Sequence, residues 1–170
     1  LIWMDREWND GYEIIAVEFH NDGSAGEFRF RPSEEASARN CITSAGMNTP
    51  SGKYLFEPGK ALMKAGGYNL IALRAGITGL GASTHYYLLD SDEKAEDLKS
   101  LGKIFRIKSI SNLDKRSIKA IGKACPKAEV TARNIPMDTD TLRKKLGVTS
   151  GDDAHIFGLK SDTAGNLLIV

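Results

Sequence analysis

The chain has 170 residues, of which 41% are hydrophobic and 26% charged, and its formal net charge is +1 at pH 7. These values are typical of a globular protein with one ordinary domain or two small ones. No apolar run approaches the roughly 18 residues that a membrane-spanning helix needs, and the N-terminus lacks the basic and apolar regions of a signal peptide. We therefore expect a cytoplasmic protein with no membrane partner. The first residue is Leu rather than Met, so we also expect the chain to be part of a longer protein.

The small net charge hides an uneven distribution along the sequence. Residues 1–100 hold 10 Lys and Arg against 15 Asp and Glu, a net charge of −5, whereas residues 101–170 hold 13 against 7, a net charge of +6. Such asymmetry is found where a basic module binds a polyanion. It is equally compatible with two halves that neutralise each other across an interface, and both interpretations stay open at this point.

The first third of the sequence predicts a β-hairpin and a linker. Residues 12–31 combine a β-rich run, turn-forming Asn, Asp and Gly at 21–23, and an alternation of Phe with charged residues at 27–31. Residues 32–50 carry Ser, Ala, Asn, Gly and Thr with little periodicity, which is typical of a linker or a long surface loop.

The middle of the sequence changes to helical spacing. Apolar residues recur every three to four positions within 54–76, which predicts a helix with Pro58 in its first turn. The two glycines at 66–67 would kink this helix or let it pack closely, and Gly76 would end it. A short strand is expected at 85–89, followed by an acidic turn.

The last third has the most regular pattern. Strands and helices alternate there, and the two final strands form a hairpin over the turn SDTAG. The predicted order is β-α-β-α-β-β, and with the preceding hairpin and helix the fold class is α/β (α+β). The expected elements are strands at 104–110 and 128–134, helices at 113–124 and 142–147, and strands at 155–160 and 166–170. Thr139 or Asp138 is expected to cap the second helix, and Gly147 to end it.

Both predicted helices of the last third carry basic residues that could bind an anion. On the first helix, lysines spaced by four residues share one face. On the second helix two leucines face the core, so the three basic residues between them must cover the exposed side. Together with the end of the preceding strand they could grip adjacent phosphates without reading sequence; the alternative is a solvated charged surface. The candidate phosphate-binding residues are Lys115, Arg116, Lys119, Arg133, Asn134, Arg143, Lys144 and Lys145.

No catalytic constellation emerges from the sequence. The glycines of GITGLGAS (76–83) do not fit GxGxxG, the three histidines are isolated and interpreted as structural, and Cys41 and Cys125 are not at metal-ligand spacing. We therefore predict no catalytic, cofactor-binding or metal-binding residue in this chain. Aromatic residues are sparse after position 100, so a bound nucleic acid would be recognised by backbone shape, as in structured RNA, rather than by stacking.

Two segments resemble parts of known proteins. YLFEPGKALMKAGGYN (54–69) and THYYLLDSD (84–92) resemble a small ferredoxin-like unit of bacterial class I S-adenosylmethionine-dependent methyltransferases. ARNIPMDTDTLRKKLGVTSGDDAHIFGLK (132–160) resembles the THUMP-like domain at the C-terminus of the same proteins, with its strand ending in Arg-Asn, hydrophobic-Pro pair, LRKxL helix and Gly-Asp turn.

This resemblance implies a fold, a division of the chain and a function. Residues 1–48 would be a hairpin and linker at the end of a methyltransferase domain, 49–102 the ferredoxin-like unit, and 103–170 the THUMP-like β-α-β-α-β-β unit. The chain would be the RNA-docking part, for tRNA in particular, of an RNA methyltransferase. S-adenosylmethionine would bind an N-terminal domain that is missing here, so this part alone would not be catalytic. The alternative is a non-catalytic interaction module whose basic half docks on an acidic protein surface.

Overall fold

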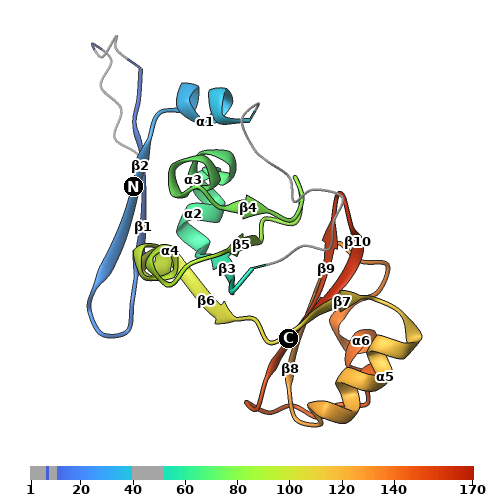
Figure 1. Ribbon diagram of the computed structural model, residues 1–170. Helices are drawn as coiled ribbons and strands as arrows, with labels where there is room; N and C mark the ends of the chain where they lie inside the picture. The colour runs from blue at the N-terminus through green and yellow to red at the C-terminus, as the bar shows by residue number, and fades with distance from the viewer. Residues whose placement is uncertain (1–6, 8–10, 40–51) are drawn as a thin grey trace.

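The computed structural model describes residues 7, 11–39 and 52–170. Its elements form four layers, in which a hairpin and helices cover one sheet, that sheet packs on a second sheet, and two further helices cover the second sheet (Figure 1). This mixed α/β architecture confirms the predicted fold class. No helix in the described part of the chain is both long and apolar enough to span a bilayer.

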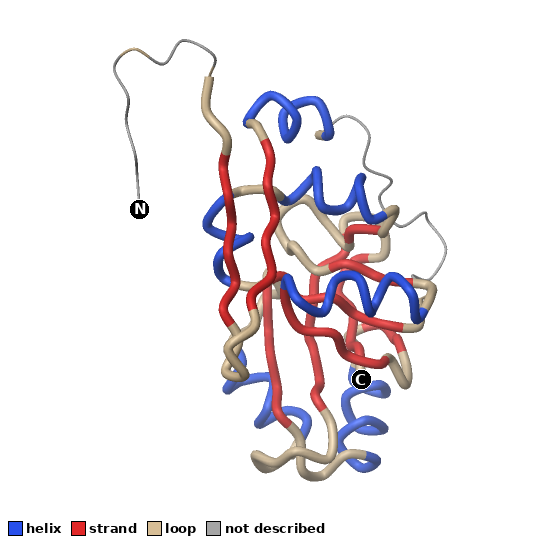
Figure 2. Tube along the Cα trace, turned by 90° about the vertical axis from the view of Figure 1, so that its left-hand side faces the viewer, coloured by secondary structure: helices blue, strands red, loops and turns tan. Residues whose placement is uncertain are grey.

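The N-terminal part contains the expected hairpin and an unexpected helix. Strands β1 (Ile14–Phe19) and β2 (Ala25–Phe30) pair antiparallel and run side by side along one edge of the molecule (Figure 2). The linker prediction was wrong over α1 (Pro32–Ala38). Proline is well suited to the first turn of a helix, and the Glu34 carboxylate accepts the Arg31 backbone N–H at 2.7 Å, which completes a cap. The rest of the expected linker, 40–50, lies outside the described residues.

The middle unit is a four-stranded antiparallel sheet in the order β4-β5-β3-β6. Its helices α2 and α3 end at glycines with positive φ, +82° at Gly66 and +59° at Gly76. Gly76 ends a helix, as predicted. The kink expected at residues 66–67 is instead a complete break between α2 and α3. The elements are β3 (Tyr54–Pro58), α2 (Lys60–Ala65), α3 (Tyr68–Ala75), β4 (Thr78–Gly79), β5 (Tyr87–Leu89), α4 (Asp92–Leu98), η1 (Lys99–Leu101) and β6 (Gly102–Arg106).

Two predictions for the middle unit were wrong. Residues 54–58 form a central strand rather than the start of a helix. Leu55 and Phe56 are buried on opposite faces of the sheet. The strand therefore has no polar face, and the alternation of polar and apolar residues that would identify it in the sequence is missing. The acidic turn is the first turn of α4, which begins because the Ser91 side chain accepts the Lys94 N–H. Acidic side chains at that position favour the helix through its dipole.

The C-terminal sheet has the order β7-β10-β9-β8, with β8 and β9 parallel and the other pairs antiparallel. The order β-α-β-α-β-β is confirmed, but the strand expected at 104–110 is divided: β6 pairs with β3 of the middle sheet, and only the next strand joins the C-terminal sheet. The predicted domain boundaries stay predictions. The elements are β7 (Ile110–Asn112), α5 (Lys115–Ala124), β8 (Glu129–Arg133), α6 (Thr139–Leu146), β9 (His155–Ser161) and β10 (Gly165–Ile169).

Alternating side chains divide the interior into three apolar clusters. Leu55 of the middle sheet and Phe157 and Leu159 of the C-terminal sheet lie between the two sheets and are at most 1% exposed. Phe56 points to the other face of its sheet, toward α2, α3 and the hairpin, while Ile156 points to α5 and α6. Each sheet therefore has two buried faces, which fixes its register, since a one-residue slip would exchange the two faces.

Helices α5 and α6 approach each other closely at Gly122. A Cβ atom at this buried position would lie 1.9 Å from the backbone oxygen of Leu146 at the end of α6. The absence of a side chain therefore lets the two helices pack in one layer on the sheet.

This contact predicts that Gly122→Ala destabilises the protein, by about 1–3 kcal/mol as expected for overpacking. Helix propensity alone predicts the opposite sign, by about 1 kcal/mol. Ala120→Gly, an exposed position of the same helix, is the control for propensity. Denaturant unfolding measures both variants, and a Gly122→Ala protein more stable than wild type would contradict the close packing.

Candidate nucleic-acid interface

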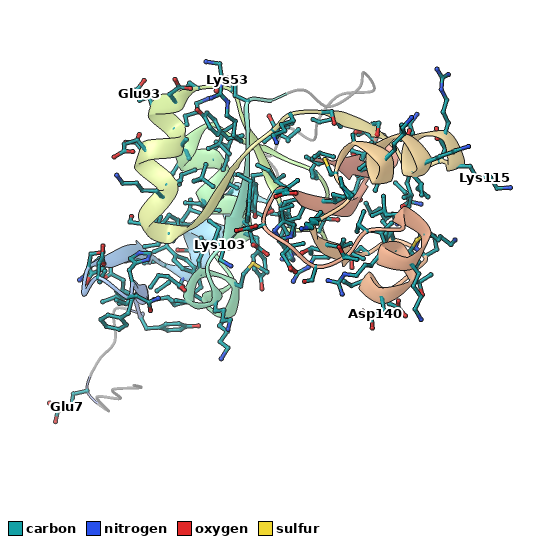
Figure 3. All side chains as sticks on the ribbon, turned by 90° about the horizontal axis from the view of Figure 1, so that it is seen from below. Glu7, Lys53, Glu93, Lys103, Lys115 and Asp140 are labelled. Carbon is teal, nitrogen blue, oxygen red and sulfur yellow. The ribbon has the colours of Figure 1, made fainter. Side chains whose placement is uncertain are left out.

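Three of the candidate phosphate-binding residues lie on the first two turns of α5. The Asp114 carboxylate accepts the Ser117 N–H at 2.7 Å and so fixes where the helix begins. Lys115, Arg116 and Lys119 follow directly and are exposed. Figure 3 shows Lys115 at the outer end of the molecule, on the side away from Glu93.

Helix α6 places two further candidates in the same outer layer. The Asp138 carboxylate caps it by accepting the Thr141 N–H at 2.7 Å. Leu142 and Leu146 are buried against the sheet, as predicted. The side chains of Lys144 and Lys145 are exposed in consequence. We call five exposed cations the outer basic layer: Lys115, Arg116, Lys119, Lys144 and Lys145. None of the five forms an ion pair with another residue in the described ranges.

Arg143 belongs to α6 but is held inside the fold. Its guanidinium lies 3.7 Å from a carboxylate oxygen of Glu129 on β8 and 3.5 Å from one of Asp140, and its side chain is 30% exposed. Its Nε is buried without a hydrogen-bond partner among the described residues. Two carboxylates thus compensate much of its charge, so Arg143 offers less attraction to phosphate than the lysines beside it.

Arg133 and Asn134 lie at the other end of β8 from Arg143. Because Glu129 begins the strand and Arg133 ends it, the two ends are about 13 Å apart at 3.3 Å per residue. The Arg133 guanidinium lies over the Tyr86 ring, 5.6 Å from its centroid. The structure therefore does not bring Arg133 and Asn134 together with the basic residues of α6, as the sequence interpretation supposed.

Asn134 connects the end of β8 to the loop between β4 and β5. It adopts a left-handed backbone conformation, φ +57°, and its Nδ2 donates to the backbone oxygen of Ser83 at 2.6 Å. Asn is among the few residue types that tolerate this conformation. The side chain is thus committed to joining the middle and C-terminal units.

Sequence reasoning missed His85, which lies in the same loop. It is a second non-glycine residue with positive φ, +53°, and its ring stacks on Tyr68 with centroids 3.9 Å apart. Burial and then the neighbouring charge of Arg133 lower the pKa of its imidazole. The partner on α3 is distant in sequence, so no local signal marks the pair.

His155 has structural contacts, as expected for an isolated histidine. Its Nε2 lies 2.8 Å from the Thr131 hydroxyl, and its ring is nearly parallel to that of Phe157 at 4.0 Å. Burial is the main cause that lowers its pKa.

The glycine-rich segment 76–83 does not form a dinucleotide-binding turn. It leaves the end of α3, passes through β4 and enters a loop, whereas that turn requires a strand leading directly into a helix. These residues therefore do not fit a Rossmann-type cofactor. In the described ranges no three His, Cys, Asp or Glu side chains group as metal ligands would; Cys41 lies outside those ranges.

No ion pair among the described residues joins the two halves of the chain. Within the part that the structure describes, every salt bridge joins two residues on the same side of position 100. The interface between the sheets is instead apolar. This argues against ion-paired compensation between the halves, although the pKa of Asp92, lowered mainly by the hydrogen bond from Tyr54, is lowered further by the charge of Arg106 across position 100.

Comparisons with known proteins agree with this architecture. Residues 102–170 match the family described as THUMP domain-like, and residues 54–98 match a ferredoxin-like domain. The fold is similar to the crystal structure of a "putative methyltransferase" from Porphyromonas gingivalis W83, with a TM-score of 0.77 and 25% sequence identity. That match covers 92% of this chain but 37% of the other, so the chain spans little more than a third of that protein. No curated protein matches the sequence.

The pKa values of His85 and His155 are lowered in the folded protein, which predicts that its stability depends on pH. In the unfolded chain both side chains regain the ordinary pKa of about 6.5. The folded state then binds fewer protons in this range, so its stability is full above about pH 6.5 and decreases as the pH falls through the folded pKa values. His155→Phe keeps a ring against Phe157 but cannot titrate. Its melting temperature should fall less than that of wild type between pH 7 and pH 5, and an equal fall would contradict the role of burial.

Proposed function

We propose that this chain is the RNA-binding part of an S-adenosylmethionine-dependent RNA methyltransferase, and that tRNA is the RNA it docks. The THUMP domain-like match and the likeness to the Porphyromonas gingivalis protein support this proposal. So does the resemblance to THUMP domains, which bind tRNA in several tRNA-modifying enzymes. The single observation that carries it is the outer basic layer, whose five exposed cations form no ion pair with a described carboxylate.

The outer basic layer has the chemistry of a phosphate-binding surface. Its four lysines act as point charges, and Arg116 can form a bidentate pair with a phosphate. Contacts of this kind position a protein on the RNA backbone without reading bases. Binding should release counterions and therefore weaken steeply as salt rises.

Methyl transfer would take place in a domain outside these residues. We propose that this domain binds S-adenosylmethionine, has the class I fold and contacts the outward face of the hairpin. On that face Phe19 is 80% exposed and Ile15 is 44% exposed, more apolar surface than a solvated strand needs.

The proposal predicts that charge reversal in the outer basic layer weakens tRNA binding. Lys144→Glu with Lys145→Glu should lower the affinity at low salt. It should also reduce the slope of log K against log salt by about 1 to 2, since each lost phosphate contact removes roughly 0.7–0.9 from the slope. Electrophoretic shift of the chain against total tRNA at several salt concentrations measures both quantities.

Lys60→Glu with Lys64→Glu is the matched control, because these two lysines lie on α2 of the middle unit, away from the outer basic layer. Arg143 is unsuitable for the test, since its ion pairs with Glu129 and Asp140 make a folding defect hard to separate from lost binding. Unchanged tRNA affinity of the α6 variant at low salt would remove the RNA assignment. The alternative of a protein-docking module, whose basic half meets an acidic protein surface, would then account for the layer.

A further inference from the structure

A cavity of about 470 Å³ lies beside α3 and the loop 80–86 that joins β4 to β5. Its size falls within the range of roughly 300–1,000 Å³ that is usual for small-molecule sites. Arg39, Tyr68, Asn69, His85 and Asp162 line it, together with residues of the glycine-rich segment. Nothing in the outer basic layer contributes to this cavity.

The wall of the cavity is fixed by contacts between the middle and C-terminal units. Asp162, just after β9, accepts the Ala82 N–H at 2.8 Å, and its own N–H donates to the backbone oxygen of Leu80. A Cβ atom at Gly81 would lie 2.7 Å from Asp162 Oδ1, so a larger residue would displace this carboxylate. Buried Thr84 donates its hydroxyl to the Lys160 backbone oxygen at 2.7 Å. The loop is therefore preorganised rather than free to collapse into the cavity.

The stacked rings of Tyr68 and His85 form an aromatic wall. The Tyr68 hydroxyl donates to the Met63 backbone oxygen at 2.7 Å, and the Tyr87 hydroxyl donates to the Tyr68 backbone oxygen at 2.8 Å. These bonds fix the position of Tyr68. His85 is held against it in the left-handed conformation that disfavours most side chains. Backbone strain of this kind is concentrated where a protein must hold a side chain in one place.

One cationic group lies beside the aromatic wall. Arg39 lines the cavity, whereas Arg133 lies outside its lining and acts on His85 only through its charge, which Glu35 opposes. The Asp162 carboxylate also lines the cavity and accepts the Ala82 N–H. The lowered pKa of His85 leaves its imidazole mainly neutral near pH 7, so it presents a flat ring without a charge of its own. A neutral ring pair beside the Arg39 guanidinium is complementary to a planar base joined to a phosphate.

We propose that this cavity binds one unpaired nucleotide, with its base against the Tyr68–His85 stack and its phosphate toward Arg39. That the nucleotide belongs to an RNA strand rests on the proposed function. The cavity itself requires only a nucleoside monophosphate. It would add a stacking contact at the end of β8 opposite the basic residues of α6. The sequence predicted no such stacking contact, because aromatic residues are sparse after position 100.

The test is a proton NMR titration of the whole chain with AMP, observing the ring protons of the three histidines. His85→Gly identifies the His85 signals and removes the ring, and glycine accepts the positive φ of this position without strain. His155→Phe is the matched control, because it also removes an imidazole but at a position that does not line the cavity. Circular dichroism of both variants checks that they remain folded.

A saturable upfield shift confined to the His85 signals is expected, together with wild-type-like binding by His155→Phe. His85→Gly should raise the dissociation constant for AMP by a factor of about 5 to 150, the range that base–aromatic stacking supplies. No saturable His85 shift, equal shifts of all three histidines, or unaltered AMP affinity of His85→Gly would overturn the proposal. Because the titration contains no RNA, AMP binding without tRNA binding would reject the proposed function alone, and tRNA binding without AMP binding would reject the cavity alone.

Discussion

The packing of the two sheets against each other is the constraint on which the rest of the structure depends. Leu55 meets Phe157 and Leu159 in a cluster that excludes water from one face of each sheet. Burial on this scale is the dominant favourable contribution to folding. The same packing positions the two candidate binding surfaces. It places the loop 80–86 next to the end of β9, and α5 and α6 cover the opposite face of the C-terminal sheet (Figure 1). The candidate interface and the cavity both follow from this one contact.

The two surfaces have different physical characters. The outer basic layer is exposed, so its contribution to binding would be electrostatic, long in range and sensitive to salt. The cavity is small and walled by fixed rings, so its contribution would be short in range and would depend on whether a base is free to enter. An RNA with both a helical stem and an unpaired nucleotide could engage the two at once. The affinity for RNA would then come mainly from the outer basic layer on α5 and α6, and the cavity would discriminate between RNAs with and without a free base.

Much of the C-terminal unit could be predicted because its signals are local. Asp138, Leu142, Leu146 and Gly147 mark the cap, the buried face and the end of α6 within ten residues. Strand β3 was misread because both faces of a central strand are apolar, and then period two and period 3.6 cannot be told apart over five residues. The internal pairing of Arg143 and the Tyr68–His85 stack could not be predicted, since each depends on elements that tertiary structure alone brings together.

Chemical cross-linking of lysines to bound tRNA, with the attached peptides identified by mass spectrometry, tests the central claim most directly. The account predicts nucleotide adducts on Lys115, Lys119, Lys144 and Lys145, and none on Lys60 or Lys64, which are also exposed. Adducts that disappear at high salt would agree with phosphate contacts. Adducts confined to residues 1–100, or distributed evenly over all exposed lysines, would contradict the assignment of the outer basic layer as the RNA-binding surface.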